Sequence, residues 1–490
     1  MKKLLLLLLP FSALSQYFQQ DVSYQIDVKL DDKNHILRGF ETIQYKNNST
    51  QSLSTIYMHV WPNAYKNSQT ALAQQLKRNE GDKLAKADSK DLGSIDSLDF
   101  KVNGSAIQWE YDPVHIDIVL LHLATPLAPG QQIAISTPFK VKIPSGSLSR
   151  LGHIGQSYQI TQWYPKPAVF DQNGWNAMPY LNQGEFYSEF GSFDVKITVP
   201  ANYVVGATGE LQTASEVAFL ETKVAESKKK LEKLLKEETD RSKNFPESAS
   251  TWKTIQYKQD RVHDFAWFAD KRFLVLQGEV VLPHSKDTVT TWAMFTPQNA
   301  KLWANSLEYL HDGTYYYSLW NGDYPYKQYS FIQGGDGGME YAMCTLMLGN
   351  GSFEGISGTA AHELAHSWFQ HILASNESKH PWMDEGFTSF IEDLALNEFS
   401  EKKVANPFKG SYMAYAKLVE SGKEQPQSTH GDRYDENRSY SISSYVKGSI
   451  FLSQLGYLIG QDKLKETLHR YYADFKFKHP TPNDIKRSAE

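Results

Sequence analysis

The sequence predicts a multidomain α+β protein in which a β-rich N-terminal domain precedes a domain of mixed helices and strands. Up to about residue 270, apolar and polar residues alternate in short segments, as they do in half-buried strands. From residue 271 onward, apolar residues recur at longer, helical spacings. With 490 residues, of which 41% are hydrophobic and 22% charged, the chain is long enough for two or three domains.

Residues 16–270 are predicted to form the β-rich domain. A turn separates its first two expected strands, the second of which runs to Tyr45, and similar alternation returns at 193–199. Frequent turns between such segments are typical of antiparallel sheets. The apolar side of the first strand consists of Val22, Tyr24, Ile26, Val28 and Leu30.

Two stretches interrupt this alternation. Residues 71–91 are charged and polar, and they predict a surface loop with some helix. Residues 221–248 contain a run of lysines and glutamates with only a weak apolar stripe, which favours a solvated helical insertion. A helix that binds a membrane or a partner is the less favoured interpretation of this run.

Residues 1–15 have the pattern of a secretory signal peptide. Two lysines precede six leucines, and the segment ends in Ala13-Leu14-Ser15, a small-x-small pattern typical of a cleavage site. The apolar run is too short to span a bilayer, and no later stretch reaches transmembrane length. We therefore expect a secreted or periplasmic protein of a bacterial envelope, without an integral membrane segment after cleavage.

Charge and cysteine content narrow the function classes. The net charge is −6 with both signs well mixed, so nothing indicates a nucleic-acid partner. The single cysteine, Cys344, lies in an apolar run and is expected to be a buried thiol without a reactive role. Export without disulfides is consistent with a chain whose size supplies its core.

Residues 359–369 contain the pattern His362-Glu363-x-x-His366. In a helix the two histidines would lie one turn apart on one face, a spacing that can hold one zinc ion. Glu363 would then lie where a carboxylate can take a proton from water. An apolar stripe supports the helix, and Ser357 and Gly358 are candidate caps before it.

Glu385 is the expected third ligand. Eighteen residues separate it from His366, enough to finish one helix, turn near residues 375–378 and return on a second helix. Two histidines and one glutamate leave the fourth position of a zinc ion open, as a catalytic site requires. The alternative is a solvated histidine pair on a core helix, which the agreement of these features disfavours.

Three motifs in this order resemble the aminopeptidase N family of zinc metallopeptidases, gluzincins related to leukotriene hydrolase. The first is the zinc pattern, with Glu385 inside Trp-Met-Asp-Glu-Gly-Phe. The second is residues 337–341, Gly-Gly-Met-Glu-Tyr, which are similar to the family's Gly-x-Met-Glu-Asn strand. The third is residues 444–448, Ser-Tyr-Val-Lys-Gly, which resemble its Tyr-x-Lys-Gly segment. The resemblance implies a thermolysin-like zinc peptidase domain over 271–490.

The resemblance also implies roles for individual residues. Tyr445 would donate to the oxyanion of the tetrahedral intermediate, with Tyr440 as the runner-up. Glu340 would bind the free α-amine of the substrate. Independently of the resemblance, Glu392 lies seven residues after Glu385 on the same helical face, and it would either orient a histidine ligand or be a plain surface residue. The substrate would be a peptide. Gly337 and Gly338, which lack side chains, would let its backbone approach closely.

Two positions depart from the family pattern. Tyr341 stands where the family has asparagine. The family's Thr-Gln-x-Glu or Thr-Gln-x-Gln segment has its nearest counterpart at residues 161–164, where Tyr164 replaces the last acid or amide. Gln162 remains as a candidate contact for the amine. These departures leave hydrolysis credible but leave amine recognition and side-chain preference open.

The function expected from the sequence is release of N-terminal residues from peptides by a one-zinc aminopeptidase. The alternatives are a zinc hydrolase of other peptide bonds or of epoxides, and an inactive zinc-binding interaction protein. Residues from Thr481 have the pattern of a fresh helix start, with Glu490 soon after it. Since the family usually carries a further helical domain, we expect the chain to be truncated or to lack that domain.

Overall fold

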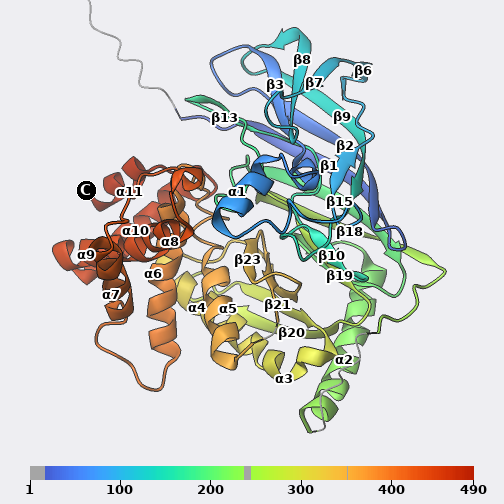
Figure 1. The fold of residues 1–490 in the computed structure, drawn as a ribbon. Helices are drawn as coiled ribbons and strands as arrows, with labels where there is room; N and C mark the ends of the chain where they lie inside the picture. The colour runs from blue at the N-terminus through green and yellow to red at the C-terminus, as the bar shows by residue number, and fades with distance from the viewer. Residues whose placement is uncertain (1–16, 237–243, 350) are drawn as a thin grey trace, which may run out of the picture.

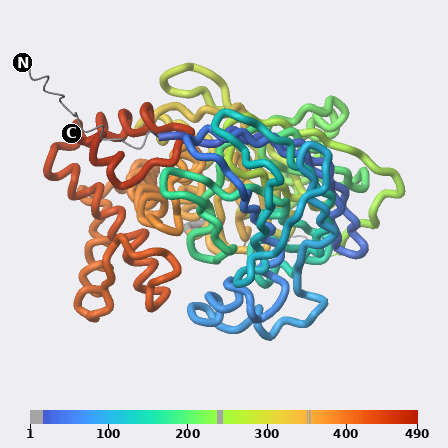
Figure 2. The backbone as a smooth tube through the Cα atoms, turned by 90° about the horizontal axis from the view of Figure 1, so that it is seen from above, coloured from blue at the N-terminus to red at the C-terminus, as the bar shows by residue number. Residues whose placement is uncertain are grey.

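The computed structural model describes residues 17–236, 244–349 and 351–490, whose arrangement is shown in Figure 1. The signal peptide expected at 1–15 and residues 237–243 of the charged insertion lie outside the described residues. Strands dominate the N-terminal half and helices the C-terminal end. Seen from above in Figure 2, the C-terminal helices (red) lie to one side of the N-terminal strands (blue). The predicted α+β class is confirmed.

The N-terminal region is organised on one sheet, hereafter the large sheet. Among the described residues its order is β17-β18-β15-β1-β2-β9-β5-β6, and β4 also pairs with β9. In β1 (Asp21–Asp31) alternate side chains are buried, as the sequence predicted. The other members are β2 (Ile36–Lys46), β4 (Ser94–Asp96), β5 (Lys101–Val102), β6 (Ser105–Ala106), β9 (Gln132–Lys142), β15 (Gly191–Pro200), β17 (Glu210–Leu211) and β18 (Trp252–Val262).

One pairing in the large sheet differs from the expected antiparallel domain. β1 runs parallel to β15, with Val22 opposite Gly191. The two strands are far apart in sequence, so no hairpin dictates their direction, and a parallel ladder also satisfies the backbone donors and acceptors. Local alternation identifies a strand, but it does not identify the strand's neighbour.

Smaller sheets complete the N-terminal region. One has the order β10-β11-β19-β16 and another the order β12-β3-β8-β7, while β13 pairs with β14. Their bounds are β3 (Leu53–His59), β7 (Gln108–Tyr111), β8 (Ile118–Leu127), β10 (Gly152–Ile154), β11 (Ser157–Ile160), β12 (Lys166–Pro167), β13 (Val169–Asp171), β14 (Gly174–Asn176), β16 (Val204–Ala207) and β19 (Trp267–Asp270).

The second half of the chain contains a mixed sheet, hereafter the site sheet, with the order β20-β21-β22-β24-β23. Its central strands β21, β22 and β24 are parallel, whereas β20 and β23 pair antiparallel at its edges. The edge strand β23 carries Glu340. The bounds are β20 (Leu274–Val281), β21 (Thr288–Phe295), β22 (Gln328–Gln333), β23 (Gly338–Tyr341) and β24 (Cys344–Met347).

Helices pack on the site sheet and on one another. α4 contacts β20, β21 and α5; α5 contacts β23 and β24; and α6 packs against α5 and α9. Short 3-10 helices occur at Trp61–Tyr65, Pro297–Asn299 and Gly431–Arg433. The α-helices are α1 (Ala71–Asn79), α2 (Ala214–Lys236), α3 (Ala300–Trp303), α4 (Ser306–Asn321), α5 (Phe353–Ala365), α6 (Pro381–Phe399), α7 (Lys409–Glu420), α8 (Asn437–Ser441), α9 (Lys447–Ile459), α10 (Gln461–Phe475) and α11 (Pro482–Ala489).

The charged stretch forms helix α2, which begins earlier than the sequence predicted. Its weak apolar stripe buries Leu220, Val224 and Leu234, and the helix packs against β20. The lysines and glutamates between these positions are largely exposed. This amphipathic packing, with a charged outer face, is that of a surface helix. No helix in the described ranges has both the length and the apolar character needed to cross a membrane.

Two helical segments of this half are irregular. Residues 304 and 305 separate α3 from α4, and here the Ser306 hydroxyl donates to the Trp303 carbonyl at 2.7 Å. The buried Trp303 indole is itself anchored on the Gly349 carbonyl at 3.3 Å. A π-helical segment, Ile442–Val446, leads directly into α9.

Candidate active site

Helix α5 presents the two histidines of the His-Glu-x-x-His pattern. The Ser352 hydroxyl caps its start by accepting from the Gly355 N–H at 3.1 Å, so Ser357 and Gly358 lie inside the helix and are not its caps. The helix ends at Ala365, shorter than the apolar stripe predicted, and His366 is its C-cap. The Nε2 atoms of His362 and His366 are 3.2 Å apart.

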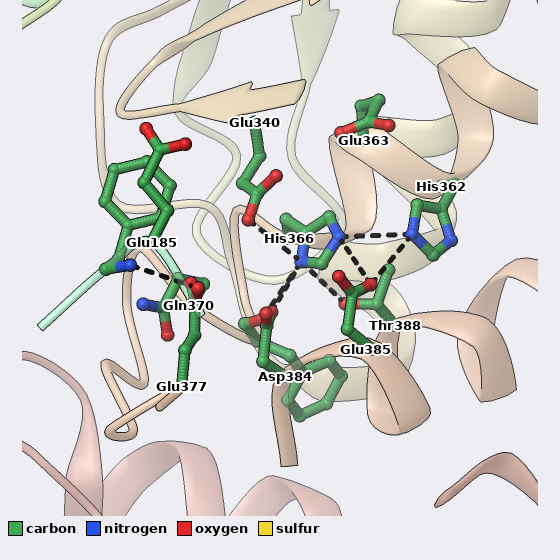
Figure 3. A network of polar contacts seen from close by, with 12 residues as sticks. Glu185, Glu340, His362, Glu363, His366, Gln370, Glu377, Asp384, Glu385 and Thr388 are labelled. Carbon is green, nitrogen blue, oxygen red and sulfur yellow. Dashed lines mark hydrogen bonds and ion pairs between the residues drawn. The ribbon is translucent and has the colours of Figure 1, made fainter. Parts of the chain in front are cut away.

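Glu385 lies opposite these histidines on the first turns of α6, as Figure 3 shows. Its Oε2 is 3.2 Å from His362 Nε2 and 3.4 Å from His366 Nε2. Ligand atoms about 2.1 Å from a tetrahedral zinc ion stand about 3.4 Å apart. The three atoms therefore form a triangle of the size that zinc requires, and the donor set fits this ion.

Outer hydrogen-bond partners orient both imidazole rings. His362 Nδ1 lies 2.8 Å from Glu392 Oε2, and His366 Nδ1 lies 2.6 Å from Asp384 Oδ1. Carboxylates at this position keep the proton on Nδ1 and leave the Nε2 lone pair free for a metal. Of the two interpretations that the sequence left open for Glu392, the geometry supports the orienting one.

Glu363 lies beside the histidines and is 7% exposed. Its Oε2 has no hydrogen-bond partner among the described residues. Burial, partly offset by His362 and His366, raises the pKa of Glu363 to about 7. A carboxylate with such a pKa is suited to exchange protons near neutral pH.

Gly338 has a packing role that the sequence pattern did not indicate. A Cβ atom at this position would collide with the Glu363 carboxylate and with the Thr359 methyl group, whereas a Cβ on Gly337 would meet nothing within 4 Å. Gly338 thus makes room for Glu363 between β23 and α5. The expected role of both glycines in the approach of a substrate backbone stays a prediction; the crowding at Gly338 comes from the protein.

Glu340 projects from β23 toward the same centre. It is 4% exposed, and its Oε1 is 3.8 Å from His366 Nδ1. Burial raises the pKa of Glu340 to about 8, with His366 acting in the opposite direction. A cation bound here would favour its ionised form.

Tyr445 lies in the π-helical segment, a distortion that frequently accompanies functional positions. Its ring stacks on His362, with centroids 5.6 Å apart and planes at 14°. Burial and then the Glu385 carboxylate raise the pKa of Tyr445 well above its ordinary value, so the hydroxyl keeps its proton at neutral pH and can donate a hydrogen bond. Tyr440 is also nearby, with its ring centroid 6.5 Å from that of Tyr445.

Close packing of two glycines positions this tyrosine. A Cβ on Gly386 of α6 would collide with the backbone of Gly448 on α9, and the reverse also holds. The helices can therefore approach closely just where α6 carries Glu385 and where the π-helical segment precedes α9. The glycine of the Tyr-x-Lys-Gly segment has a packing role that the sequence pattern did not reveal.

A cavity of about 220 Å³ opens beside these groups. It lies between the N-terminal region, the edge strand β23 and the C-terminal helices. The lining is strongly polar and includes several acids. The residues are Glu80, Arg150, Asn182, Gln183, Gly184, Glu185, Met339, Glu340, Glu377, Glu385, Asn437, Tyr440, Ser441 and Tyr445.

Gln162 and Tyr164 do not line this cavity. Gln162 Nε2 donates to Glu185 at 3.1 Å, and its Oε1 accepts from Lys166 Nζ at 2.5 Å. The Tyr164 hydroxyl donates to Asp264 at 3.0 Å deep in the N-terminal region. Both the nitrogen and the oxygen of the Gln162 amide are therefore engaged by protein groups.

Glu185 lines the cavity, whereas Gln162 and Tyr164 do not. No sequence motif had indicated this residue. It forms a 2.6 Å ion pair with Arg150 and accepts hydrogen bonds from Gln162, Tyr180 and Tyr341. The hydroxyl of Tyr341, where the family has asparagine, therefore holds Glu185 at 3.1 Å. Isolated charged residues in loops have no periodic pattern, and the sequence contains no signal that would have indicated them.

Comparison with known families and proteins agrees with these motifs. Residues 314–490 match the Peptidase family M1 domain. Human endoplasmic reticulum aminopeptidase 1 is 28% identical over 133 residues, which are 27% of this chain and 14% of that protein. Leucine aminopeptidase 2 from Emericella nidulans is 30% identical over 134 residues, 26% of this chain and 21% of that protein. The alignments thus span about a fifth or less of the length of these relatives.

Similarity to solved structures extends over nearly the whole chain. An M1 zinc metallopeptidase variant from Deinococcus radiodurans, bound to a Tyr-Ser-Ala substrate, has a TM-score of 0.60 at 16% identity over 96% of this chain and 90% of that chain. Another structure of the Deinococcus enzyme gives 0.60 at 16% identity over 96% and 89%. The fold that this chain shares with the Deinococcus enzyme therefore includes both the N-terminal region and the site sheet. Residues 314–490 thus match the peptidase family M1, and the relatives support an aminopeptidase N-type zinc metallopeptidase.

Proposed function

We propose that this chain is a zinc-dependent aminopeptidase that releases N-terminal residues from peptides. The observation that carries the proposal is the triangle of His362, His366 and Glu385 ligand atoms, 3.2–3.4 Å apart, with Glu363 and Tyr445 beside it. The aminopeptidases among its relatives support the same activity class.

His362, His366 and Glu385 would hold one zinc ion, with Glu392 and Asp384 orienting the two imidazoles. When bound, zinc supplies Lewis acidity toward a peptide carbonyl and lowers the pKa of water. Glu363 accepts the proton of the attacking water and passes it to the leaving amine. The Tyr445 hydroxyl donates to the oxyanion that develops on the former carbonyl.

Glu340 is proposed to bind the protonated N-terminus across the cavity. Its carboxylate is buried and lines the space next to Glu385 and Tyr445. A buried charge pairs poorly with an acetylated or internal residue, because such a ligand leaves the carboxylate without a partner. This discrimination would restrict cleavage to free N-termini.

The test measures how fast the wild type and Glu363→Gln hydrolyse a panel of aminoacyl-fluorophores. Each protein is assayed as prepared, with a chelator, and after zinc is restored. The variant should keep zinc and lose at least about a hundredfold in turnover. Free peptides should be cut far faster than their N-acetylated forms. Equal rates for both forms would favour a hydrolase of other peptide bonds, and zinc binding without turnover on peptides or epoxides would favour an interaction protein.

We also propose a signal peptide at 1–15 and a secreted or periplasmic location, supported by the basic, leucine-rich and small-x-small pattern of that segment. N-terminal sequencing of the exported protein should begin at Gln16. The proposed domains are 16–270 and 271–490, and the start of the site sheet at Leu274 supports this division. Limited proteolysis between the two regions would test it.

A further inference from the structure

Three buried carboxylates from different elements meet beside His366. They are Glu340 on β23, Glu377 in the loop between α5 and α6, and Asp384 on α6, and Figure 3 shows all three around one centre. One oxygen of each lies within 4.8 Å of the others. The exposed fractions are 4% for Glu340, 4% for Glu377 and 1% for Asp384.

The three carboxylates are not equally engaged. Asp384 is bound to His366 Nδ1 at 2.6 Å and orients that ring. One oxygen of Glu377, Oε2, accepts from the Phe186 N–H at 3.0 Å. The other, Oε1, accepts no hydrogen bond from any described residue. Because Glu377 and Glu340 line the same cavity, a buried acceptor without a partner lies next to the proposed amine ligand.

The surroundings of Glu377 disfavour its ionised form unless a cation binds to it. Burial, and then the neighbouring carboxylates Asp384 and Glu340, raise its pKa well above the ordinary value. Arg150, the cation that lines the cavity, is already paired with Glu185 at 2.6 Å. An ionised carboxylate buried among others is costly unless a positive group binds to it.

The spacing of the oxygens admits an ammonium group. A protonated amine donates three hydrogen bonds of about 2.8 Å in tetrahedral directions, so its acceptors stand about 4.6 Å apart. The carboxylate oxygens of Glu340 and Glu377 lie within the limit of 4.8 Å. One ammonium nitrogen can therefore contact both.

We propose that Glu377 is the second carboxylate of the site that binds the substrate's α-ammonium, together with Glu340. The inference rests on the proposed aminopeptidase function and deepens it. Glu377 would supply the acceptor that Tyr164 does not provide, from a loop distant from residues 161–164. Glu377 is less suited to bind the side-chain amino group of a substrate lysine. The four-carbon stem of lysine separates that group from the α-amine, which Glu340 already holds.

The experiment compares two zinc-binding probes, leucine hydroxamate and its des-amino counterpart, 4-methylpentanohydroxamate. Both carry the same metal-binding group, so their affinity ratio isolates the amine. Calorimetry on the zinc-loaded wild type, Glu377→Gln, Glu377→Asp and Glu340→Gln measures this ratio. Glu80→Gln is the matched control, since Glu80 lines the same cavity from an exposed position.

Glu377→Gln should lower the ratio by about tenfold to a hundredfold, as loss of a charged hydrogen bond does. Affinity for the des-amino probe, zinc content and melting temperature should stay near wild type, because the amide can still accept from Phe186. Glu377→Asp should restore part of the ratio, and Glu80→Gln should leave it unchanged. A similar loss in Glu340→Gln would support a shared site.

Several results would overturn the inference. One is a ratio unchanged in Glu377→Gln although Glu340→Gln lowers it. Another is a loss seen with lysine hydroxamate alone, which would assign Glu377 to the substrate side chain. A second zinc equivalent that disappears in Glu377→Gln would assign the carboxylates to a metal. Failure of both probes to bind the wild type would instead contradict the zinc site and, with it, the proposed function.

Discussion

His362 Nδ1 lies 2.8 Å from Glu392 Oε2, on the far side of the imidazole ring from the proposed metal position. Glu392 follows Glu385 by about two turns of α6. The contact joins the two helices that supply the ligands. Because the carboxylate holds the Nδ1 proton, it orients Nε2 toward Glu385 and raises the basicity of the ligand.

Glu392→Gln should therefore weaken zinc binding by about tenfold to a hundredfold. Competition with a chromogenic chelator measures this affinity directly, without dependence on turnover. Glu401→Gln is the control, since Glu401 lies just beyond the same helix in an exposed position. Equal zinc affinity in Glu392→Gln and wild type would show that the hydrogen bond does not support the ligand.

Tyr445→Phe removes one hydroxyl and preserves the ring that stacks on His362. Loss of an oxyanion donor should lower kcat by about a hundredfold to a thousandfold, with a much smaller change in KM. Tyr440→Phe is the matched variant, because both rings line the cavity. If Tyr440→Phe shows the large loss and Tyr445→Phe does not, the donor has been assigned to the wrong tyrosine.

Gly338→Ala should displace the Glu363 carboxylate, with which the new methyl group would collide. We expect a loss of at least about tenfold in kcat, because a general base must stay within hydrogen-bond reach of its proton. Zinc content should be retained. Gly337→Ala is the adjacent control, as its Cβ meets nothing within 4 Å. Similar activities for the two variants would contradict the packing role of Gly338.

Asp117, which lies outside the site, should make the free energy of unfolding depend on pH. It is buried, its Oδ2 accepts from the Tyr180 N–H at 2.7 Å, and burial raises its pKa to about 7. The folded state thus binds more protons than the unfolded chain between pH of about 4 and 7, and stability falls as pH rises through this window.

Asp117→Asn should remove this pH-dependent loss of stability, while its amide oxygen can still accept the hydrogen bond from the Tyr180 N–H. At pH 4 the variant and wild type should unfold at similar denaturant concentrations, and at pH 8 the variant should be more stable, by ~4 kcal/mol at most. The exposed Asp88→Asn serves as control. A difference in stability between Asp117→Asn and wild type that does not change with pH would refute the assignment.

The sequence by itself identified the α+β class, the first strands of the β-rich region and the order of the three motifs. Helical spacing alone places His362 and His366 on one face, and the gap to Glu385 is long enough for a return helix. These are local properties, because periodicity and short motifs depend on residues within a few turns of one another. The parallel neighbour of β1 lies far away in the sequence and could not be predicted in this way.

Only the tertiary structure decided how the substrate end of the site is composed. Glu185 and Glu377 come from irregular segments far apart in the chain, yet they line one cavity with Glu340. The local match at 161–164 indicated Gln162, whereas the folded chain engages its amide with Glu185 and Lys166. The roles of Gly338 and Gly448 became clear only from the groups packed against them. A sequence pattern specifies which side chains are available, but the packing of distant segments determines which of them face the substrate and which are satisfied by protein partners.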